Sequence, residues 1–170
     1  MSKPPRNPLL ATQTAILAAP AFWLRITATE LALLGIEFLT QAAHTTDPTN
    51  PNTHPVLTQA CTQLDRWLKN PATVFNLPLA ITGTAFRQRV WAEMAKIPRG
   101  QTRTYGDIAK TLNSAPRAVG QACGDNPFPI IVPCHRVVSQ TGLGGFNHST
   151  GDDLARIKHW LLTHEICAQS

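Results

Sequence analysis

Residues 104–124 read TYGDIAKTLNSAPRAVGQACG, and this stretch has the clearest helix boundaries in the chain. Thr104 is followed by Asp107 three positions later, which is the pattern of a capping box, where the two side chains close the first turn of a helix. We therefore expect a short helix that runs through Leu112.

A second helix is predicted over residues 115–123. We expect Ser114 to cap it, Pro116 to occupy its first turn and Gly124 to lie beyond its end. Two short helices across a tight turn predict a helix-turn-helix, in which the second helix normally enters a groove of DNA. Arg117 is the only charged residue on that helix, so it is a candidate to probe the duplex; the alternative is an arginine that is simply solvated.

Two longer helices are predicted on either side. Thr84 is expected to cap a helix that ends at Pro98, because apolar residues recur there at helical spacing: Phe86, Val90, Met94 and Ile97. Asp152 and Asp153 suit the start of a last helix, whose apolar stripe of Leu154, Ile157 and Leu161 continues to Glu165. A carboxylate on a buried stripe needs a partner; the alternative is a stripe that emerges into solvent.

The first half of the chain has weaker signals. Residues 22–39 hold β-branched and aromatic patches that predict a hairpin around residues 27–30, and a polar, proline-rich loop follows over residues 44–55. Apolar residues at helical spacing predict a helix over residues 56–68, and residues 76–83 are expected to be an exit linker.

The pattern therefore predicts two domains, a structural domain over residues 1–83 and a functional domain over residues 84–170. The formal charge of +5 is concentrated in the second, which carries ten Lys or Arg against six Asp or Glu, compared with five against four in the first. A polyanionic partner would face the second domain; a normally solvated surface is the alternative.

Composition excludes some classes of protein. No segment approaches the ~20 apolar residues of a membrane span, and the four cysteines lack the short paired spacing that holds zinc. We expect no metal and no membrane contact, and a reducing, cytoplasmic location. Residues 9–21 loosely imitate a signal peptide, but Thr12, Gln13 and Thr14 interrupt the apolar run.

The chemistry is expected at residues 130–136, which read IIVPCHR. This apolar run leads inward and ends with a thiol beside an imidazole. Burial raises the pKa of a thiol, so Cys134 needs a base or a positive charge to become a nucleophile, and His135 and Arg136 are candidates for both. The alternative is a small core cysteine next to an exposed histidine.

With these motifs the chain resembles the O6-alkylguanine-DNA alkyltransferases, also called methylated-DNA-protein-cysteine methyltransferases. The resemblance covers essentially all of residues 84–166. It rests on GTAF at 83–86, IPRGQT at 97–102, TYGDIA at 104–109, RAVG at 117–120, Asn126-Pro127, PCHR at 133–136 and WLLTHE at 160–165.

The family implies an α/β fold with a ribonuclease-H-like sheet and helix in the first domain, and a mostly helical, winged-helix-like second domain with a helix-turn-helix. It also implies catalytic roles. Cys134 would be the nucleophile and alkyl acceptor, His135 would be its general base through a water, and Glu165 would orient His135. Asn126 would brace the turn before the active site.

Substrate and DNA contacts follow from the same resemblance. Tyr105 would donate to a guanine ring nitrogen, and Arg117 would enter the base stack from the minor-groove side. Further candidates at this interface are Ala118, Gly120, Arg136, Val137, Phe146 and Ser149. A longer loop over residues 147–153 departs from the family pattern and would wall the alkyl side of the pocket.

The expected function is repair of duplex DNA, without a cofactor, by irreversible, single-turnover alkyl transfer from O6-alkylguanine, and less efficiently O4-alkylthymine, to Cys134. We expect a monomer, with cooperative binding along DNA left open. Three alternatives remain: a lesion-binding protein without transfer, a helix-turn-helix transcription factor, and a thiol hydrolase built on Cys134, His135 and Glu165. The first normally lacks the acceptor cysteine; the others would show sequence preference and multiple turnovers, respectively.

Overall fold

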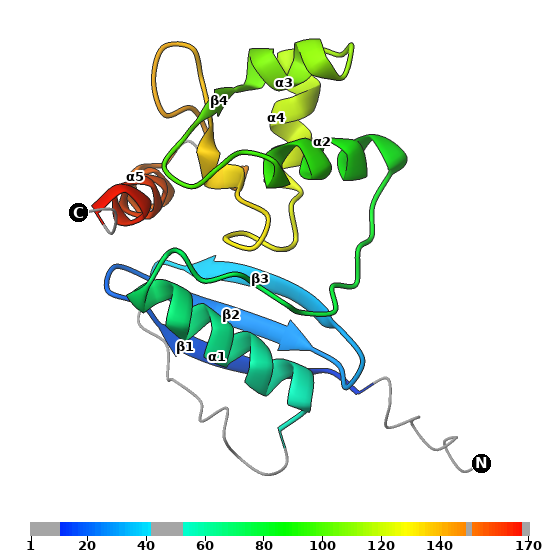
Figure 1. Cartoon of the computed structure of the whole chain (residues 1–170), viewed down its shortest axis with the longest axis vertical. Coiled ribbons are helices and arrows are strands. Elements are labelled where there is room, and N and C mark those ends of the chain that lie inside the picture. The colour runs from blue at the N-terminus through cyan, green and yellow to red at the C-terminus, as the bar shows by residue number, and fades with distance from the viewer. Residues whose placement is uncertain (1–10, 42–52, 149–150, 168–170) are drawn as a thin grey trace. The chain divides into compact units, whose positions relative to one another are not determined.

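The computed structural model describes residues 11–41, 53–148 and 151–167, which form two compact units (Figure 1). The first unit consists of the described residues up to residue 69 together with residues 73–80. The second unit consists of residues 70–72 and the described residues from 81 onward. The described chain holds five α-helices, a three-stranded antiparallel sheet and a two-stranded parallel pair. The expected α/β class is confirmed.

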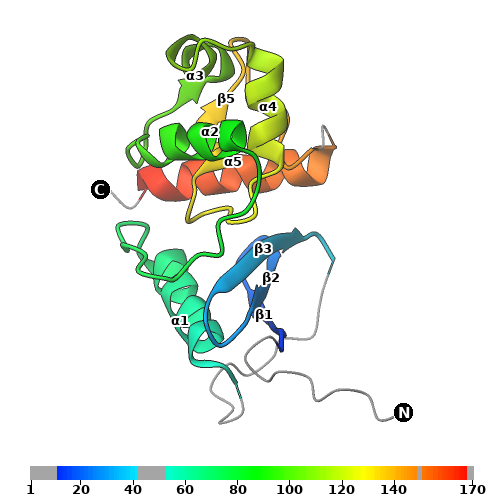
Figure 2. The same ribbon diagram turned by 90° about the vertical axis from the view of Figure 1, so that its right-hand side faces the viewer.

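The first unit is an antiparallel sheet covered by one helix. Its strands β1 (Gln13–Ala18), β2 (Trp23–Ala28) and β3 (Leu33–Leu39) pair in chain order, and α1 (Pro55–Lys69) packs along the sheet (Figures 1 and 2). Alternate residues of β2 are buried, as are the apolar residues that predicted α1 at 56, 57, 60, 64 and 67. The buried side chains of β2, which alternate along the strand, and those of α1, which recur at helical spacing, thus belong to one core.

The structure of this unit differs from the expectations at two places. β1 lies inside the leader-like stretch 9–21, where the residues alone did not predict a strand. The exit linker is not a free segment, because Leu33 donates to the Pro78 carbonyl (2.8 Å) and Ala80 donates to the Leu33 carbonyl (2.9 Å). Most of the predicted loop over residues 44–55 lies outside the described residues.

The second unit begins with α2 (Ala85–Ala95), whose first turn is capped by Thr84 as predicted. The capping box of Thr104 and Asp107 is also confirmed at the start of α3 (Tyr105–Thr111). Local capping rules therefore identified both helix starts.

The start of the next helix, α4 (Pro116–Gly124), differs from the expectation. Ala115, not Ser114, is the N-cap residue, and Gly124 belongs to the helix. Pro116 explains the first difference, because a proline disfavours helical geometry in the residue before it, and Ala115 is extended. Ser114 instead donates its backbone N–H to the Ala109 carbonyl at 2.8 Å.

The rest of the unit is built around a parallel pair of short strands. β4 (Arg103–Thr104) pairs with β5 (Val137–Val138), which follows directly on a 3-10 turn over Cys134–Arg136. The last helix, α5 (Asp152–Cys167), and α2 both pack against that turn. Two helices therefore hold the turn that contains Cys134.

Candidate active site

Cys134 and His135 lie in the 3-10 turn and both side chains are buried. The segment before them is braced by Asn126, whose Nδ2 donates to the Val132 carbonyl (2.8 Å) while its Oδ1 accepts from the Phe128 N–H (3.0 Å). The Asn126 side chain thus links residues 128 and 132, the two ends of the loop that leads to the thiol. This is the stabilising position that the family resemblance predicts for it.

Glu165 is fully buried and faces two partners on the turn. Its Oε1 lies 2.8 Å from Nε2 of His135, and Arg136 donates to the same carboxylate from Nε (3.0 Å) and Nη2 (2.7 Å). The buried carboxylate predicted from the helical stripe therefore has its partner. Arg136, which was expected at the DNA interface, is directed to Glu165 and to the Ile97 carbonyl (2.6 Å).

These contacts set the charges of the site. Burial would raise the pKa of Glu165, but the hydrogen bonds from His135 and Arg136 outweigh it and lower the pKa to about 2. Burial lowers the pKa of His135 more than Glu165 raises it, so the imidazole is neutral at pH 7 and can accept a proton.

The thiol itself rests in its protonated form. Burial raises the pKa of Cys134, although a hydrogen bond from Asn126 and the charge of Lys158 act in the opposite direction. A base is therefore required to make the thiolate.

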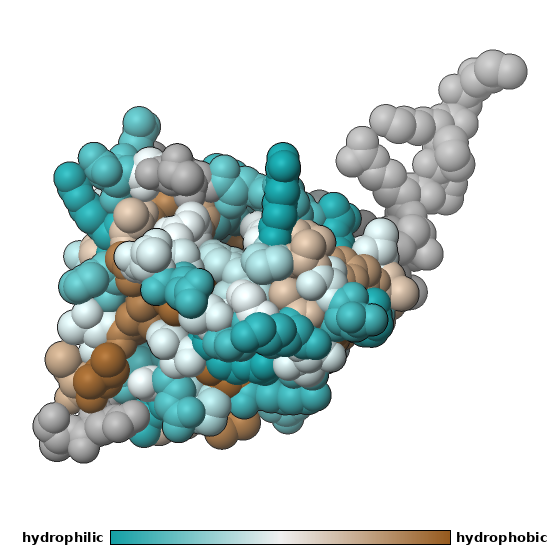
Figure 3. Space-filling view, turned by 90° about the horizontal axis from the view of Figure 1, so that it is seen from above, coloured by the Kyte–Doolittle hydropathy of each residue, from teal (hydrophilic) through white to brown (hydrophobic). Residues whose placement is uncertain are grey.

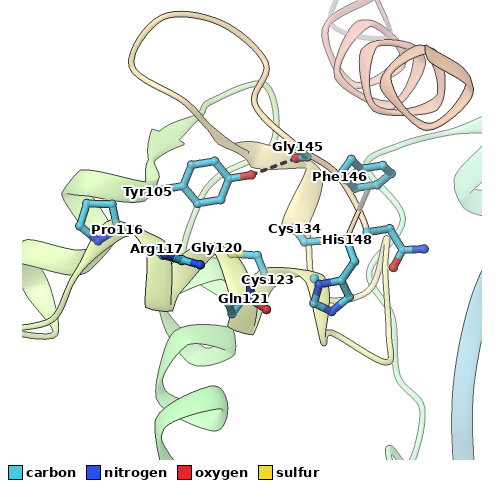
Figure 4. Close-up of a pocket in the computed structure, with 12 residues that line it drawn as sticks. Tyr105, Pro116, Arg117, Gly120, Gln121, Cys123, Cys134, Gly145, Phe146 and His148 are labelled. Carbon is cyan, nitrogen blue, oxygen red and sulfur yellow. Dashed lines mark hydrogen bonds between the residues drawn. The ribbon is translucent and has the colours of Figure 1, made fainter. Parts of the chain in front are cut away.

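Cys134 opens onto a pocket with a volume of about 370 Å³ (Figure 4). Residues from α3, α4, the 3-10 turn and the loop after Gly145 line it: Tyr105, Pro116, Arg117, Gly120, Gln121, Cys123, Gly124, Cys134 and residues 145–148. The pocket has the size and concave form of a small-molecule or nucleobase site.

The structure brings four of the predicted contact residues to this pocket, Tyr105, Arg117, Gly120 and Phe146. Tyr105 donates its hydroxyl to the Gly145 carbonyl (3.0 Å), and burial raises its pKa, so it remains a donor. Arg117 is exposed in the first turn of α4, followed by half-buried Ala118. Phe146 is buried in the wall. Ser149 lies outside the described residues.

Lys158 is a residue of this site that the sequence reasoning missed. Its side chain is fully buried on α5, and Nζ donates to the carbonyls of Val137 (2.7 Å), Leu143 (2.6 Å) and Gly145 (3.0 Å). Burial lowers its pKa to about 8. Lys158 lies four residues after Leu154, so it belongs to the same helical stripe that predicted the burial of Glu165. That spacing was the sequence signal that could have identified Lys158.

The second unit is similar to a known family of proteins. Residues 85–167 match the family model described as the DNA binding domain of 6-O-methylguanine DNA methyltransferase. A methylated-DNA–protein-cysteine methyltransferase from Archaeoglobus fulgidus is 44% identical over 90 residues, which are 53% of this chain and 61% of that protein. The aligned chain thus spans about three fifths of that relative.

The similarity to solved structures extends over both units. The crystal structure of the Mycobacterium tuberculosis O6-methylguanine methyltransferase is 32% identical, covers 93% of this chain and 94% of its own, and superposes with a TM-score of 0.75. A structure of the same organism's protein in complex with DNA is 33% identical, covers 91% and 93%, and has a TM-score of 0.73. The chain therefore belongs to the methylated-DNA–protein-cysteine methyltransferase family.

Proposed function

We propose that this protein repairs alkylated duplex DNA by moving the alkyl group from O6 of guanine to Sγ of its own Cys134. One observation carries the proposal: the buried thiol opens onto a nucleobase-sized pocket and is followed in the chain by an imidazole held 2.8 Å from a buried carboxylate. This is the donor and acceptor set that nucleophilic catalysis by a thiol requires.

The base must leave the duplex before it can reach Cys134, at a cost of a few kcal/mol in lost stacking. Arg117, exposed at the start of α4, is the residue that would fill the vacated place in the stack from the minor-groove side. Gly120 leaves space beside the ring of Tyr105, whose Cδ1 lies 4.0 Å from the position of an added Cβ. The face on which α3 lies is mainly hydrophilic, with smaller hydrophobic areas, as suits a nucleic-acid partner (Figure 3).

The chemical step is a displacement at the alkyl carbon. The thiol proton passes through a water to His135, and Glu165 stabilises the imidazolium that forms. The Sγ–C bond then forms while the O6–C bond breaks, and the proton taken from the thiol returns from His135 through water to a ring nitrogen of guanine. Tyr105 would donate a hydrogen bond to another ring nitrogen of the base. The carbonyl oxygen of Val137 would accept a hydrogen bond from the exocyclic amine of guanine. Lys158 already donates to one lone pair of this oxygen, and the second lone pair would accept from the amine.

The product is a thioether, which has no good leaving group, so each molecule acts once and needs no cofactor. We extend the proposal to slower transfer from O4-alkylthymine, to a monomeric protein that can bind cooperatively along DNA, and to a reducing, cytoplasmic location that keeps Cys134 free. Among the described helices, none has the length and apolar character needed to cross a membrane.

The test is intact mass after incubation with a duplex that carries O6-methylguanine. Wild type should gain one methylene mass and no more, Cys134→Ala should gain none, and the control Cys167→Ala, at an exposed cysteine, should behave as wild type. Tight binding without a mass gain would contradict transfer and favour a lesion-binding protein. Turnover of an ester would favour the hydrolase.

The role of Arg117 is tested separately. Arg117→Ala should slow transfer from duplex DNA much more than transfer from a free O6-benzylguanine base, which needs no extrusion from a stack. Arg25→Ala in the first unit is the matched control. Equal slowing on both substrates would contradict the proposed role of Arg117 in extruding the base.

A further inference from the structure

We propose that His148 limits the size of the alkyl group that the acceptor pocket admits. This inference rests on the proposed function. It concerns the loop over residues 147–153, whose extra length the family pattern does not explain, and its described residue His148, which lines the pocket together with Cys134 (Figure 4).

The pocket runs along α4, and its lining residues mark successive positions on that helix. Arg117 is in the first turn, Tyr105 lies over Gly120 in the middle, and His148 lies over Gly124 at the end. At 1.5 Å per residue, Arg117 and Gly124 are about 10 Å apart along the axis. A base that enters past Arg117 and Tyr105 therefore has His148 ahead of it.

The imidazole of His148 lies directly on the backbone of Gly124. A Cβ added to Gly124 would be 2.6 Å from Cε1 and 2.6 Å from Nδ1 of His148, closer than real Cβ atoms approach other atoms. The glycine at the end of α4 thus makes room for the ring. Without a side chain at that position, the ring forms this part of the wall.

The ring is also held in place from the other side. Nε2 of His148 is 2.8 Å from Oδ1 of Asp125, and Oδ2 of Asp125 is 2.5 Å from Nη2 of Arg87 on α2. Asn147 and His148 both have positive φ angles, 50° and 58°, which residues other than glycine rarely adopt. The contact with Asp125 holds the ring of His148, whose side chain is 46% exposed, at the wall of the pocket.

The reactive sulfur lies near the same end of the pocket. Cys123 precedes Gly124 on α4, and it lines the pocket with Cys134. Burial raises the pKa of Cys123 to about 12, and the charge of a Cys134 thiolate adds to the shift, as expected for neighbouring thiols. In Figure 4, His148 and Phe146 lie on the side of Cys134 away from Arg117. An alkyl group that points from the base to Sγ therefore extends toward His148, and a bulky group meets the ring before its reactive carbon reaches the sulfur.

The experiment compares transfer from duplexes that carry O6-methylguanine or O6-benzylguanine, followed by intact mass. In His148→Ala the ratio of the benzyl rate to the methyl rate should rise about tenfold or more, the scale on which a pocket discriminates small apolar groups. Asp125→Ala keeps the imidazole of His148 but removes its hydrogen-bond partner, so the ratio of the benzyl rate to the methyl rate should rise by a smaller factor. Asp65→Ala, on α1, is the control and should leave the ratio unchanged.

The outcomes separate the two proposals. An unchanged ratio in His148→Ala, with methyl transfer retained, overturns the role of His148 and leaves the proposed function intact. If His148→Ala does not fold, an unchanged ratio in Asp125→Ala has the same meaning. A wild-type protein that transfers no methyl group overturns the proposed function and this inference with it.

Discussion

Lys158 donates a hydrogen bond from Nζ to the carbonyl oxygen of Val137 at 2.7 Å, although its side chain has no solvent exposure. The same ammonium donates to the carbonyls of Leu143 and Gly145, and it lies 5.7 Å from the ring centre of Tyr105 and 5.8 Å from that of Phe146. One charged group on α5 therefore holds β5, the loop after it and the wall of the pocket together.

Replacing Lys158 by Met should destabilise this arrangement, because three carbonyls lose a donor that solvent does not replace. We expect the free energy of unfolding to fall by about 3 kcal/mol, and alkyl transfer to slow at a temperature where the variant is still folded. Urea unfolding and a single-turnover time course measure the two effects. Lys110→Met, at an exposed position of α3, should change neither by much.

The ion pair at Glu165 should make the protein sensitive to acid. The folded-state pKa of Glu165 is about 2, below the ordinary value of 4.5, so the folded state binds fewer protons than the unfolded state. The stabilisation is complete above pH 4.5 and is lost as the pH falls from 4.5 toward 2.

Glu165→Gln should remove this part of the pH dependence and lower stability at pH 7 by about 3 kcal/mol, because His135 and Arg136 lose a buried charged partner. Urea unfolding between pH 7 and pH 3 provides the measurement. Glu37→Gln, in an exposed pair with Arg25, should lose less than about 1 kcal/mol. The assignment fails if wild type and Glu165→Gln lose the same stability between pH 4.5 and pH 3.

Tyr105→Phe should separate a substrate role from a structural one. The hydroxyl donates to the Gly145 carbonyl, which also accepts from Lys158, so that carbonyl stays satisfied and stability should change by less than about 1 kcal/mol. The rate of transfer should fall about tenfold or more, because the proposed donor to the guanine ring is lost. A large fall in melting temperature with a normal rate would assign the hydroxyl to packing instead.

Trp91→Phe tests what holds α2 to α4. The indole N–H donates to the Ala122 carbonyl at 2.7 Å in a buried contact. Removing the donor leaves a buried carbonyl without this partner, so the free energy of unfolding should fall by about 1–3 kcal/mol. Thermal unfolding measures the change. A melting temperature equal to that of wild type would mean that the contact adds nothing to stability.

Local rules predicted a large part of this molecule from the amino-acid order. The capping of α2 by Thr84, the capping box of Thr104 and Asp107, and the burial of Glu165 on a helical stripe all depend on residues three or four positions apart. Such neighbours meet whenever the helix forms, so their contacts can be read without the fold.

Contacts between distant segments required the tertiary structure. β1 exists because β2 pairs with it, Arg136 turns to Glu165 29 residues away, and His148 reaches Asp125 across 23 residues. The buried ammonium of Lys158 is stable because carbonyls from β5 and the following loop converge on it. The spacing of these residues in the sequence does not predict their contacts. The segments come together only when the helices and strands pack against one another.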